Sequence, residues 1–164
     1  MAKMMETTEF EKTKFMAFDL KPATLEDLDF VQNCAVAAYE KYVERMGKRP
    51  APMVADFTRS IEGGQLEIIL SDSEYAGYCV SFEKTKSLFV ENIALHPDHQ
   101  GKGLATLIFG ILENRARVAG LTSLNLYTNV KMHENLSFYS KLGFIETHRL
   151  IEEGFHRVFF KKQV

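Results

Sequence analysis

Apolar residues recur at two spacings along the chain, and the changes between them separate helices from strands. Apolar positions three and four residues apart predict long helices over residues 28–46 and 104–118, and shorter ones over 54–61 and 134–142. Alternation of apolar and polar positions predicts strands. We expect these at residues 16–20, 66–70, 75–82, 88–95, 121–128, 144–148 and 155–161.

The order of these elements predicts a single α/β domain in which helices flank a mixed, mostly antiparallel sheet. The helix over residues 104–118 connects the strands over 88–95 and 121–128. Because parallel neighbours need such a crossover, we expect these two strands to form the parallel pair of the sheet. Residues 1–15 are polar and mixed in charge, so we expect a leader there and one domain over residues 16–164.

Composition argues against several classes of partner. The 164 residues carry 20 Lys and Arg against 22 Asp and Glu, whereas a nucleic-acid partner calls for an excess of positive charge. No apolar run reaches the roughly 18–20 residues of a membrane span, and residues 1–14 lack the apolar segment of a secretory signal. Cys34 and Cys79 lie far apart in apolar stretches, which predicts buried free thiols. We therefore expect a cytoplasmic protein without a membrane or nucleic-acid partner; the oligomeric state, a homodimer included, stays open.

The turn over residues 100–105 carries the clearest chemical signal. A strand ends at Leu95, and two glycines in Gln100-Gly-Lys-Gly103-Leu-Ala105 open the next helix. Glycines allow the backbone to approach a ligand closely. The first N–H groups of a helix have no internal partner and sit at its positive end. This pattern indicates a site for an anion such as a pyrophosphate, with a purely structural tight turn as the alternative.

Two common phosphate-binding motifs do not fit this turn. A P-loop needs Gly-x-x-x-x-Gly-Lys-Ser/Thr, which is absent from the chain. A dinucleotide fingerprint needs a third glycine, where Thr106 stands, and an acidic residue in the following strand, where the chain has Leu124-Asn-Leu126. Neither a P-loop nor a dinucleotide site is therefore expected.

The turn resembles the Gln/Arg-x-x-Gly-x-Gly/Ala signature of the GNAT N-acetyltransferase superfamily. The preceding Asn92-Ile-Ala-Leu-His-Pro-Asp98 is similar to that family's common lead-in. A second motif, Glu134-Asn-Leu-Ser-Phe-Tyr139-Ser-Lys-Leu-Gly143-Phe144, resembles the family's late helix and the Tyr-x-x-x-Gly-Phe within it. The element order also agrees, so the resemblance extends over about nine-tenths of the chain and implies a GNAT-like fold.

The resemblance implies acetyl-CoA as co-substrate and transfer of its acetyl group to a primary amine. It implies that the pyrophosphate lies on the turn and the pantetheine arm beside the preceding strand, whose free edge pairs like a sheet edge with the amide-rich arm. One departure is Met132, where many relatives have an Asn; Asn129 and Asn135 flank it. The cofactor-binding residues so implied are Ile93, Ala94, Leu95, Gln100, Gly101, Lys102, Gly103, Leu104, Ala105 and Asn135.

Two residues are candidates for proton chemistry. Tyr139 resembles the family's tyrosine that faces the thioester sulfur. A phenol has a pKa of about 10 and a thiol of about 8.5, so a hydrogen bond to the sulfur is easier than full proton transfer. Strand alternation places Glu91 on one face with Phe89, Ile93 and Leu95. We expect it to be partly buried there and to act as the base, directly or through water. Tyr127, on the adjacent strand, is a weaker candidate base.

The acceptor pocket, by the same resemblance, lies between the loop over residues 39–57 and the last hairpin loop over residues 148–156. Aromatic and apolar residues of the first loop would line it, carboxylates of the second would suit a cationic amine, and arginines of both would suit a carboxylate. The residues expected there are Tyr39, Tyr42, Met53, Glu152, Glu153, Arg45, Arg49, Arg149 and Arg157.

A small-molecule amine is therefore the expected acceptor. No group of His, Cys, Asp and Glu residues has metal-ligand spacing, so no metal is expected. Two other functions stay open: an acetyl-CoA-binding regulatory module without catalysis, and a protein or peptide N-acetyltransferase.

Overall fold

The computed structural model describes residues 17–164, and this part of the chain contains seven strands and five α-helices. The strands are β1 (Phe18–Pro22), β2 (Leu66–Ser71), β3 (Glu74–Lys84), β4 (Ser87–Leu95), β5 (Ser123–Asn129), β6 (Ile145–Glu152) and β7 (Phe155–Gln163). The helices are α1 (Leu28–Tyr39), α2 (Val43–Met46), α3 (Thr58–Glu62), α4 (Leu104–Val118) and α5 (His133–Lys141), with short 3₁₀ turns between some of them. The leader expected over residues 1–15 lies outside the described residues.

The strands form one sheet in the order β1-β2-β3-β4-β5-β7-β6. Each neighbouring pair is antiparallel except β4 and β5, which are parallel and are connected by α4. The predicted α/β class, the mixed sheet and its parallel pair are thereby confirmed.

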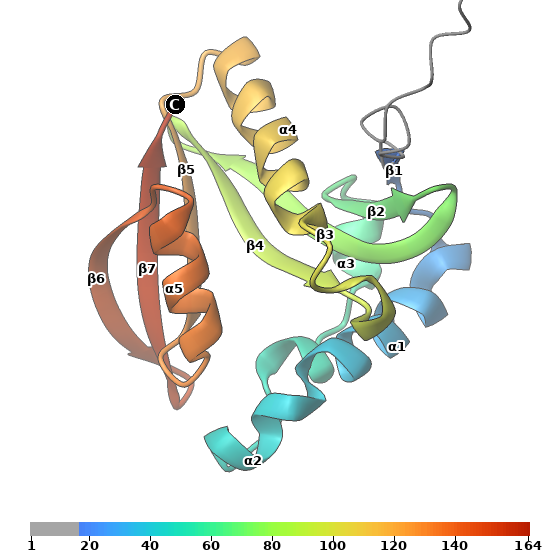
Figure 1. Cartoon of the computed structure of the whole chain (residues 1–164), viewed down its shortest axis with the longest axis horizontal. Coiled ribbons are helices and arrows are strands. Elements are labelled where there is room, and N and C mark those ends of the chain that lie inside the picture. The colour runs from blue at the N-terminus through green and yellow to red at the C-terminus, as the bar shows by residue number, and fades with distance from the viewer. Residues whose placement is uncertain (1–16) are drawn as a thin grey trace, which may run out of the picture.

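Helices lie on both faces of the sheet (Figure 1), and each face carries a hydrophobic core. One core packs α4 and α5 against β4, β5 and β7; the other packs α1 and α3 against β2 and β3. Leu104, Ile108, Leu112 and Ala116 follow one another at intervals of four on α4 and are at most 1% exposed. Burial of each Leu or Ile side chain stabilises the fold by roughly 1.5–3 kcal/mol, so α4 is held firmly above the parallel strands.

Two sequence predictions about the elements need correction. The helix expected over residues 28–46 is interrupted by a 3₁₀ turn after Tyr39, and the chain turns away at Gly47, whose φ is 71°. The long hairpin loop expected over residues 148–156 is wrong: β6 and β7 are joined by Glu153 and Gly154, both with positive φ (52° and 79°). Such a two-residue turn continues the strand twist. Alternation could not reveal β6, because its side chains are exposed almost throughout.

In the part of the chain that is described, no helix combines the length and the apolar character needed to cross a membrane.

Candidate active site

The candidate site begins where the two parallel strands diverge. β4 pairs with β5 only from Ser87 to Val90, although both strands continue further. At the same place, the register between β3 and β4 shifts, since Val80 faces Asn92 while Ser81 faces Val90. Glu91 is therefore one extra residue in β4, a β-bulge, which bends the strand and increases its twist. Figure 1 shows β4 and β5 separating below this point into an open V.

The edge of β4 that faces the V keeps backbone groups free of any strand partner. The His96 N–H donates to the Ala76 carbonyl of β3. Since successive residues of a strand direct their backbone groups to opposite edges, Ile93 and Leu95 direct theirs into the V. Both carbonyl oxygens accept hydrogen bonds from side chains. The Tyr39 hydroxyl donates to the Ile93 carbonyl (3.2 Å), and the Gln100 amide donates to the Leu95 carbonyl (2.9 Å). The N–H groups of Ile93 and Leu95 remain available to a ligand lying along this edge.

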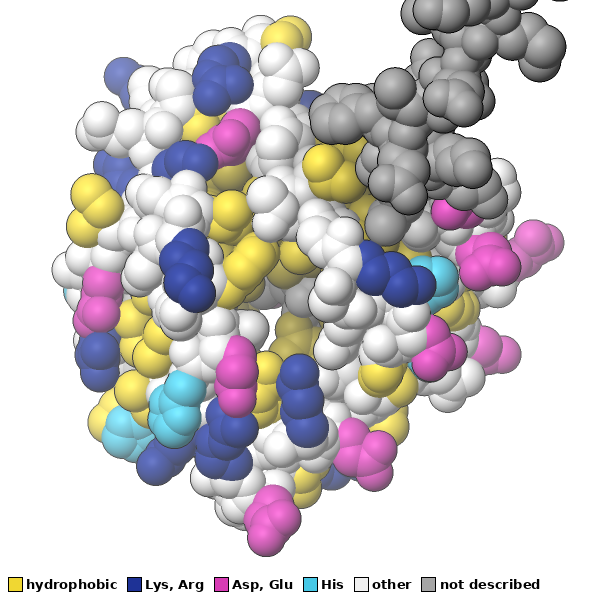
Figure 2. Space-filling model, in the orientation of Figure 1, with side chains coloured by type: hydrophobic (Ala, Val, Ile, Leu, Met, Phe, Trp, Pro, Cys, Tyr) yellow, Lys and Arg dark blue, Asp and Glu magenta, His cyan; other side chains and the backbone are white. Residues whose placement is uncertain are grey.

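Two cavities occupy the V, and they meet. The cavity of about 280 Å³ lies between the diverging ends of β4 and β5 and is called here the strand cavity. The cavity of about 420 Å³ lies between the turn over residues 100–106 and α5 and is called the turn cavity. Four residues line both: Tyr39, Ile93, Asn135 and Tyr139. Figure 2 shows this side of the molecule hollowed, with hydrophobic side chains at the floor and charged side chains along the lower rim.

The turn presents backbone donors to its cavity. Gly101 and Gly103 have φ of 75° and 79°, a left-handed conformation that glycine adopts without strain. A Cβ at either position would meet no protein atom within 4 Å, so the space beside them is open. The Leu107 N–H bonds to the Gly103 carbonyl, which leaves the preceding N–H groups of the first helical turn without a helical partner. Leu104, Ala105 and Thr106 all line the turn cavity.

Lys102, which the family resemblance placed among the cofactor-binding residues, is exposed and does not line the turn cavity. The other residues expected to bind the cofactor all lie on the wall of that cavity. Gln100 lies there with its side chain committed to the Leu95 carbonyl. Its clearest effect is to hold the turn against the end of β4.

Helix α5 carries Tyr139 and Asn135, one turn apart, on the wall between the cavities. The Tyr139 ring is 7% exposed and packs edge-to-face on Phe109 and Phe144, with centroids 5.7 Å apart in both pairs. Asn135 donates to the Thr128 hydroxyl (3.2 Å) and lies beside the Met132 sulfur. Of the two asparagines that flank Met132, Asn135 reaches both cavities, whereas Asn129 lines only the strand cavity.

The phenols on these walls stay protonated. Burial raises the pKa of Tyr139 and of Tyr39 well above the ordinary value of about 10. Burial likewise raises the pKa of Tyr127, although Arg157 opposes the shift. Each of these hydroxyls can therefore donate a hydrogen bond at neutral pH and none is suited to act as a base.

Glu91 does line the strand cavity, but the reason given for its position is wrong. The bulge interrupts alternation in β4, so Phe89 lies on the opposite face from Ile93 and Leu95. Phe89 packs against Phe82 and Tyr127, whereas Ile93 and Leu95 pack against the core beneath α4. Glu91 itself is exposed rather than partly buried, and it presents its carboxylate at the wall of the cavity.

Most charged loop residues expected in the acceptor pocket point elsewhere. Tyr39 and Arg157 line the strand cavity; Tyr42 lines the turn cavity instead. Glu152 pairs with Arg157 at 2.5 Å, and Arg149 pairs with Glu146. The residues expected there that line neither cavity are Met53, Glu152, Glu153, Arg45, Arg49 and Arg149. Loop sequence alone does not reveal which residues turn inward; Asp56, Phe57 and Phe155 line the strand cavity although the sequence did not indicate them.

Two contacts connect the walls of the V at its rim. The Arg45 guanidinium, from α2, donates to both carboxylate oxygens of Glu134 on α5 and to the Lys131 carbonyl, each at 2.9 Å. The Lys48 ammonium donates to the Gly154 carbonyl (2.7 Å) and lies 3.8 Å from the centre of the Phe155 ring. The segment that follows α1 is thereby attached to α5 and to the β6–β7 turn.

The Arg45 contact can be tested by titration. Its hydrogen bonds lower the pKa of Glu134 from 4.5 to about 2. A lowered pKa in the folded state means that the contact stabilises the fold above the ordinary pKa and is lost as pH falls toward 2. In Arg45→Met we expect the pKa of the Glu134 carboxyl to rise toward its ordinary value, as followed by NMR of the side-chain carbon. An unchanged titration in that variant would contradict the ion pair.

Both cysteines are buried and unpaired, as predicted. Burial raises the pKa of the Cys34 thiol and of the Cys79 thiol to about 12. Neither lines the strand cavity or the turn cavity, and a thiol that stays protonated is a poor nucleophile. Within residues 17–164, no three or more His, Cys, Asp and Glu side chains gather as metal ligands.

Comparison with solved structures finds the same fold at low identity. PaiA N-acetyltransferase from Thermoplasma acidophilum, in complex with coenzyme A, superposes with a TM-score of 0.73 at 16% identity, over 91% of this chain and 100% of that chain. The ribosomal-protein-S18-alanine N-acetyltransferase from Escherichia coli gives 0.70 at 15%, over 90% and 94%. A spermidine N-acetyltransferase from Vibrio cholerae, with CoA and spermine, gives 0.67 at 17%, over 89% and 95%.

A search of curated protein sequences finds no match. The sequence model of the acetyltransferase (GNAT) family, however, matches residues 32–144. This range runs from α1 through α5 and includes both cavities' shared wall residues. Because the match extends over more than half of the chain, the protein belongs to the acetyltransferase (GNAT) family.

Proposed function

We propose that this acetyltransferase moves the acetyl group of acetyl-CoA directly to a primary amine of a small molecule, with no acetylated enzyme in between. The observation that carries the proposal is the meeting of the two cavities at Tyr39, Ile93, Asn135 and Tyr139. A cofactor held in the turn cavity and an amine held in the strand cavity would have their reactive ends at this shared wall.

The turn cavity suits the cofactor by its chemistry. Its turn offers unpaired N–H groups and the positive end of α4 to a pyrophosphate. The edge of β4 offers the N–H groups of Ile93 and Leu95 to the amides of the pantetheine arm. Asn135 adds a side-chain amide on the opposite wall. Two of the structurally similar acetyltransferases were solved with CoA bound, which supports acetyl-CoA as the co-substrate.

In the proposed reaction, the amine nitrogen attacks the thioester carbon, and the C–S bond then breaks to release the CoA thiolate. An alkyl ammonium, of pKa about 10.4, must first lose a proton. Glu91 is the proposed acceptor of that proton, directly or through water. Tyr139 donates a hydrogen bond to the departing sulfur. The buried, protonated thiols of Cys34 and Cys79 support direct transfer.

The strand cavity suits a small cationic acceptor. Asp56 and Glu91 lie on its wall, and Arg157, the arginine that lines it within residues 17–164, is paired with Glu152. Its aromatic residues, among them Tyr127 and Phe155, supply apolar surface. The Arg45 and Lys48 contacts join the walls of the V at its rim, which favours a small molecule over an extended peptide.

A screen of acetyl-CoA consumption tests the proposal. The acceptors are monoamines, polyamines, amino acids and peptides with free N-termini, with thiol release as the signal. We expect the highest kcat/KM for a small amine. Turnover confined to peptides would identify a protein N-acetyltransferase instead, and acetyl-CoA binding without turnover of any amine would identify a regulatory module. The cytoplasmic location expected from the sequence stays a prediction.

Replacement of Glu91 tests the proposed base. In Glu91→Gln, we expect kcat/KM for the amine to fall about tenfold at neutral pH and the acidic limb of its pH profile to flatten, since an amide cannot accept the proton. Glu83→Gln, at an exposed position near the end of β3 and on neither cavity wall, is the matched control. A profile of unchanged shape in Glu91→Gln would assign the proton to water alone.

A further inference from the structure

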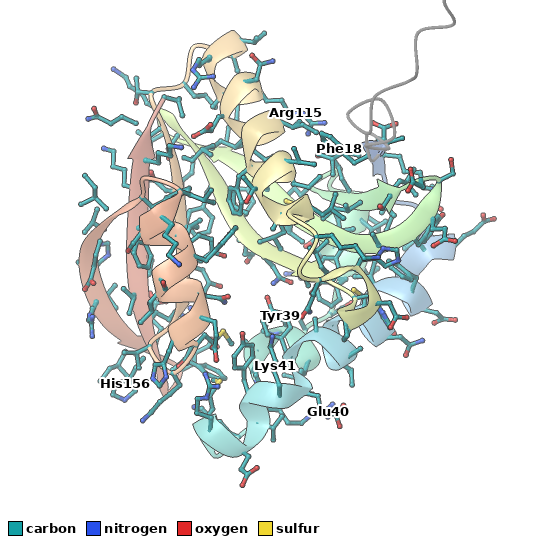
Figure 3. All side chains as sticks on the ribbon, in the orientation of Figure 1. Phe18, Tyr39, Glu40, Lys41, Arg115 and His156 are labelled. Carbon is teal, nitrogen blue, oxygen red and sulfur yellow. The ribbon has the colours of Figure 1, made fainter. Side chains whose placement is uncertain are left out.

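Three polar side chains form a continuous hydrogen-bonded chain from the core to the shared wall of the cavities. The Tyr78 hydroxyl, from β3, donates to Asn92 Oδ1 at 2.5 Å. Asn92 Nδ2, from β4, donates to the Tyr39 hydroxyl oxygen at 2.7 Å. The Tyr39 hydroxyl, at the end of α1, donates to the Ile93 carbonyl at 3.2 Å. Figure 3 shows Tyr39 at the end of α1, beside the opening between β4 and α5.

The number of protons fixes the direction of this chain. Tyr78 is fully buried and has one proton to give, which goes to the Asn92 carbonyl oxygen. The Asn92 amide therefore turns its N–H toward Tyr39, whose oxygen becomes the acceptor. Tyr39 must then direct its own proton outward, away from Asn92. The two inner hydrogen bonds polarise the outer hydroxyl and strengthen it as a donor.

The outward proton of Tyr39 is held loosely. Its bond to the Ile93 carbonyl is 3.2 Å long, beyond the usual 2.5–3.0 Å for O–H···O hydrogen bonds. Rotation about the C–O bond lets the proton reach another acceptor without movement of the ring. Because Tyr39 lines both cavities, that acceptor would be an atom at the reacting end of the cofactor.

We infer that Tyr39 is a catalytic residue which donates its hydrogen bond to the acyl oxygen of the thioester, with Asn92 and Tyr78 as positioning residues. The inference rests on the proposed acetyl transfer. As the amine nitrogen bonds to the acyl carbon, the C=O electron pair moves onto oxygen, where Tyr39 stabilises the negative charge. The pair returns as the C–S bond breaks and the thiolate leaves. Tyr39 keeps its proton throughout, while the amine gives its proton to the base.

The first test removes the donor. In Tyr39→Phe we expect kcat to fall about 100-fold, the usual cost of losing one oxyanion donor, while the Kd of CoA and the KM of the amine change less than about threefold. Tyr75→Phe, which removes a hydrogen-bonded hydroxyl away from both cavities, should leave kcat unchanged. Tyr78→Phe, which frees the Asn92 amide to rotate, should lower kcat about tenfold.

The second test reverses the direction of the hydrogen bond between residue 92 and Tyr39 while it keeps the size of the side chain. An ionised carboxylate in Asn92→Asp accepts hydrogen bonds only, so both tyrosines would donate toward it and Tyr39 would withdraw its proton from the cavity. We expect kcat as low as in Tyr39→Phe at high pH. As pH falls, the Asp carboxyl is protonated and again becomes a hydrogen-bond donor. The kcat of Asn92→Asp, divided by the kcat of the wild type at the same pH, should therefore rise. The double variant Tyr39→Phe/Asn92→Asp should be no slower than Tyr39→Phe alone.

The outcomes separate this inference from the proposed function. Wild-type protein that acetylates no amine contradicts the proposed function. Wild-type turnover together with unchanged kcat in Tyr39→Phe overturns the inference alone. A purely structural tether between α1 and β4 would instead lower the melting temperature, weaken CoA binding and give Asn92→Asp a pH-independent ratio, and that combination would equally overturn the catalytic assignment.

Discussion

Tyr139→Phe is expected to lower kcat about 100-fold while the Kd of acetyl-CoA, measured by calorimetry, stays within about twofold of the wild type. The phenylalanine keeps the ring that packs on Phe109 and Phe144, so the fold and the cavity wall are preserved. Only the hydroxyl at the junction of the cavities is lost. A donor that acts on the departing sulfur contributes to the transition state and little to the bound ground state, which places its effect in kcat.

The pH dependence of this variant separates hydrogen bonding from proton transfer. Because burial raises the pKa of Tyr139, the hydroxyl remains protonated far above neutral pH. Its loss should therefore lower kcat by the same factor across the pH range in which the enzyme is folded. An unchanged kcat would remove Tyr139 from the mechanism. A loss of kcat limited to one limb of the profile would show instead that the hydroxyl titrates during turnover.

The parts of the fold that follow from local sequence were predictable. The apolar spacing of four along α4 specifies a helix with one buried face. Parallel neighbours in a sheet need a crossover connection, and α4 supplies one between β4 and β5. The two glycines before Leu104 indicated a turn with open space beside its backbone, and both have the positive φ that glycine allows. Each of these features depends on residues that are neighbours in sequence.

The geometry of the V could not be predicted from residues that are neighbours in sequence. One inserted residue, Glu91, reverses the side of the sheet on which Phe89 lies relative to Ile93. Alternation of apolar and polar positions does not reveal such a bulge. The apolar Val90 and the polar Glu91 fit the alternating pattern equally well with or without an inserted residue. The register of β3 against β4 decides the matter, and at the bulge it depends on pairs of residues nine and twelve positions apart, Ser81 with Val90 and Val80 with Asn92.

The ion-pair and hydrogen-bond partners of polar side chains could not be predicted from the sequence either. Arg45 and Glu134 are 89 positions apart, and neither spacing nor composition indicates that they meet. The same holds for Tyr39 and Asn92, which are 53 positions apart. When its partner is unknown, the direction of a charged or polar side chain in a loop cannot be predicted. From the sequence alone, the Arg45 side chain was equally compatible with a position in the acceptor pocket. The topology that brings α1 and α5 to opposite walls of the V determines these contacts.

The largest expected effect on binding comes from Gly103→Val. The Cβ of a new side chain at this position would point into open space in the turn cavity, where the pyrophosphate is proposed to lie against the N–H groups that begin α4. Each hydrogen bond to a charged group contributes about 1.5–3 kcal/mol. Loss of two of them, about 3 kcal/mol or more, should raise the Kd of acetyl-CoA at least about 100-fold, measured by calorimetry.

Strain alone has to be separated from this effect, because valine is disfavoured at the φ of 79° that Gly103 adopts. Gly120→Val is the matched control: Gly120 follows the other end of α4, its φ is 75°, and its Cβ would also meet nothing within 4 Å. We expect both variants to lower the melting temperature by similar amounts and only Gly103→Val to lose acetyl-CoA. Unchanged affinity in folded Gly103→Val, or an equal loss in Gly120→Val, would place the phosphate site elsewhere.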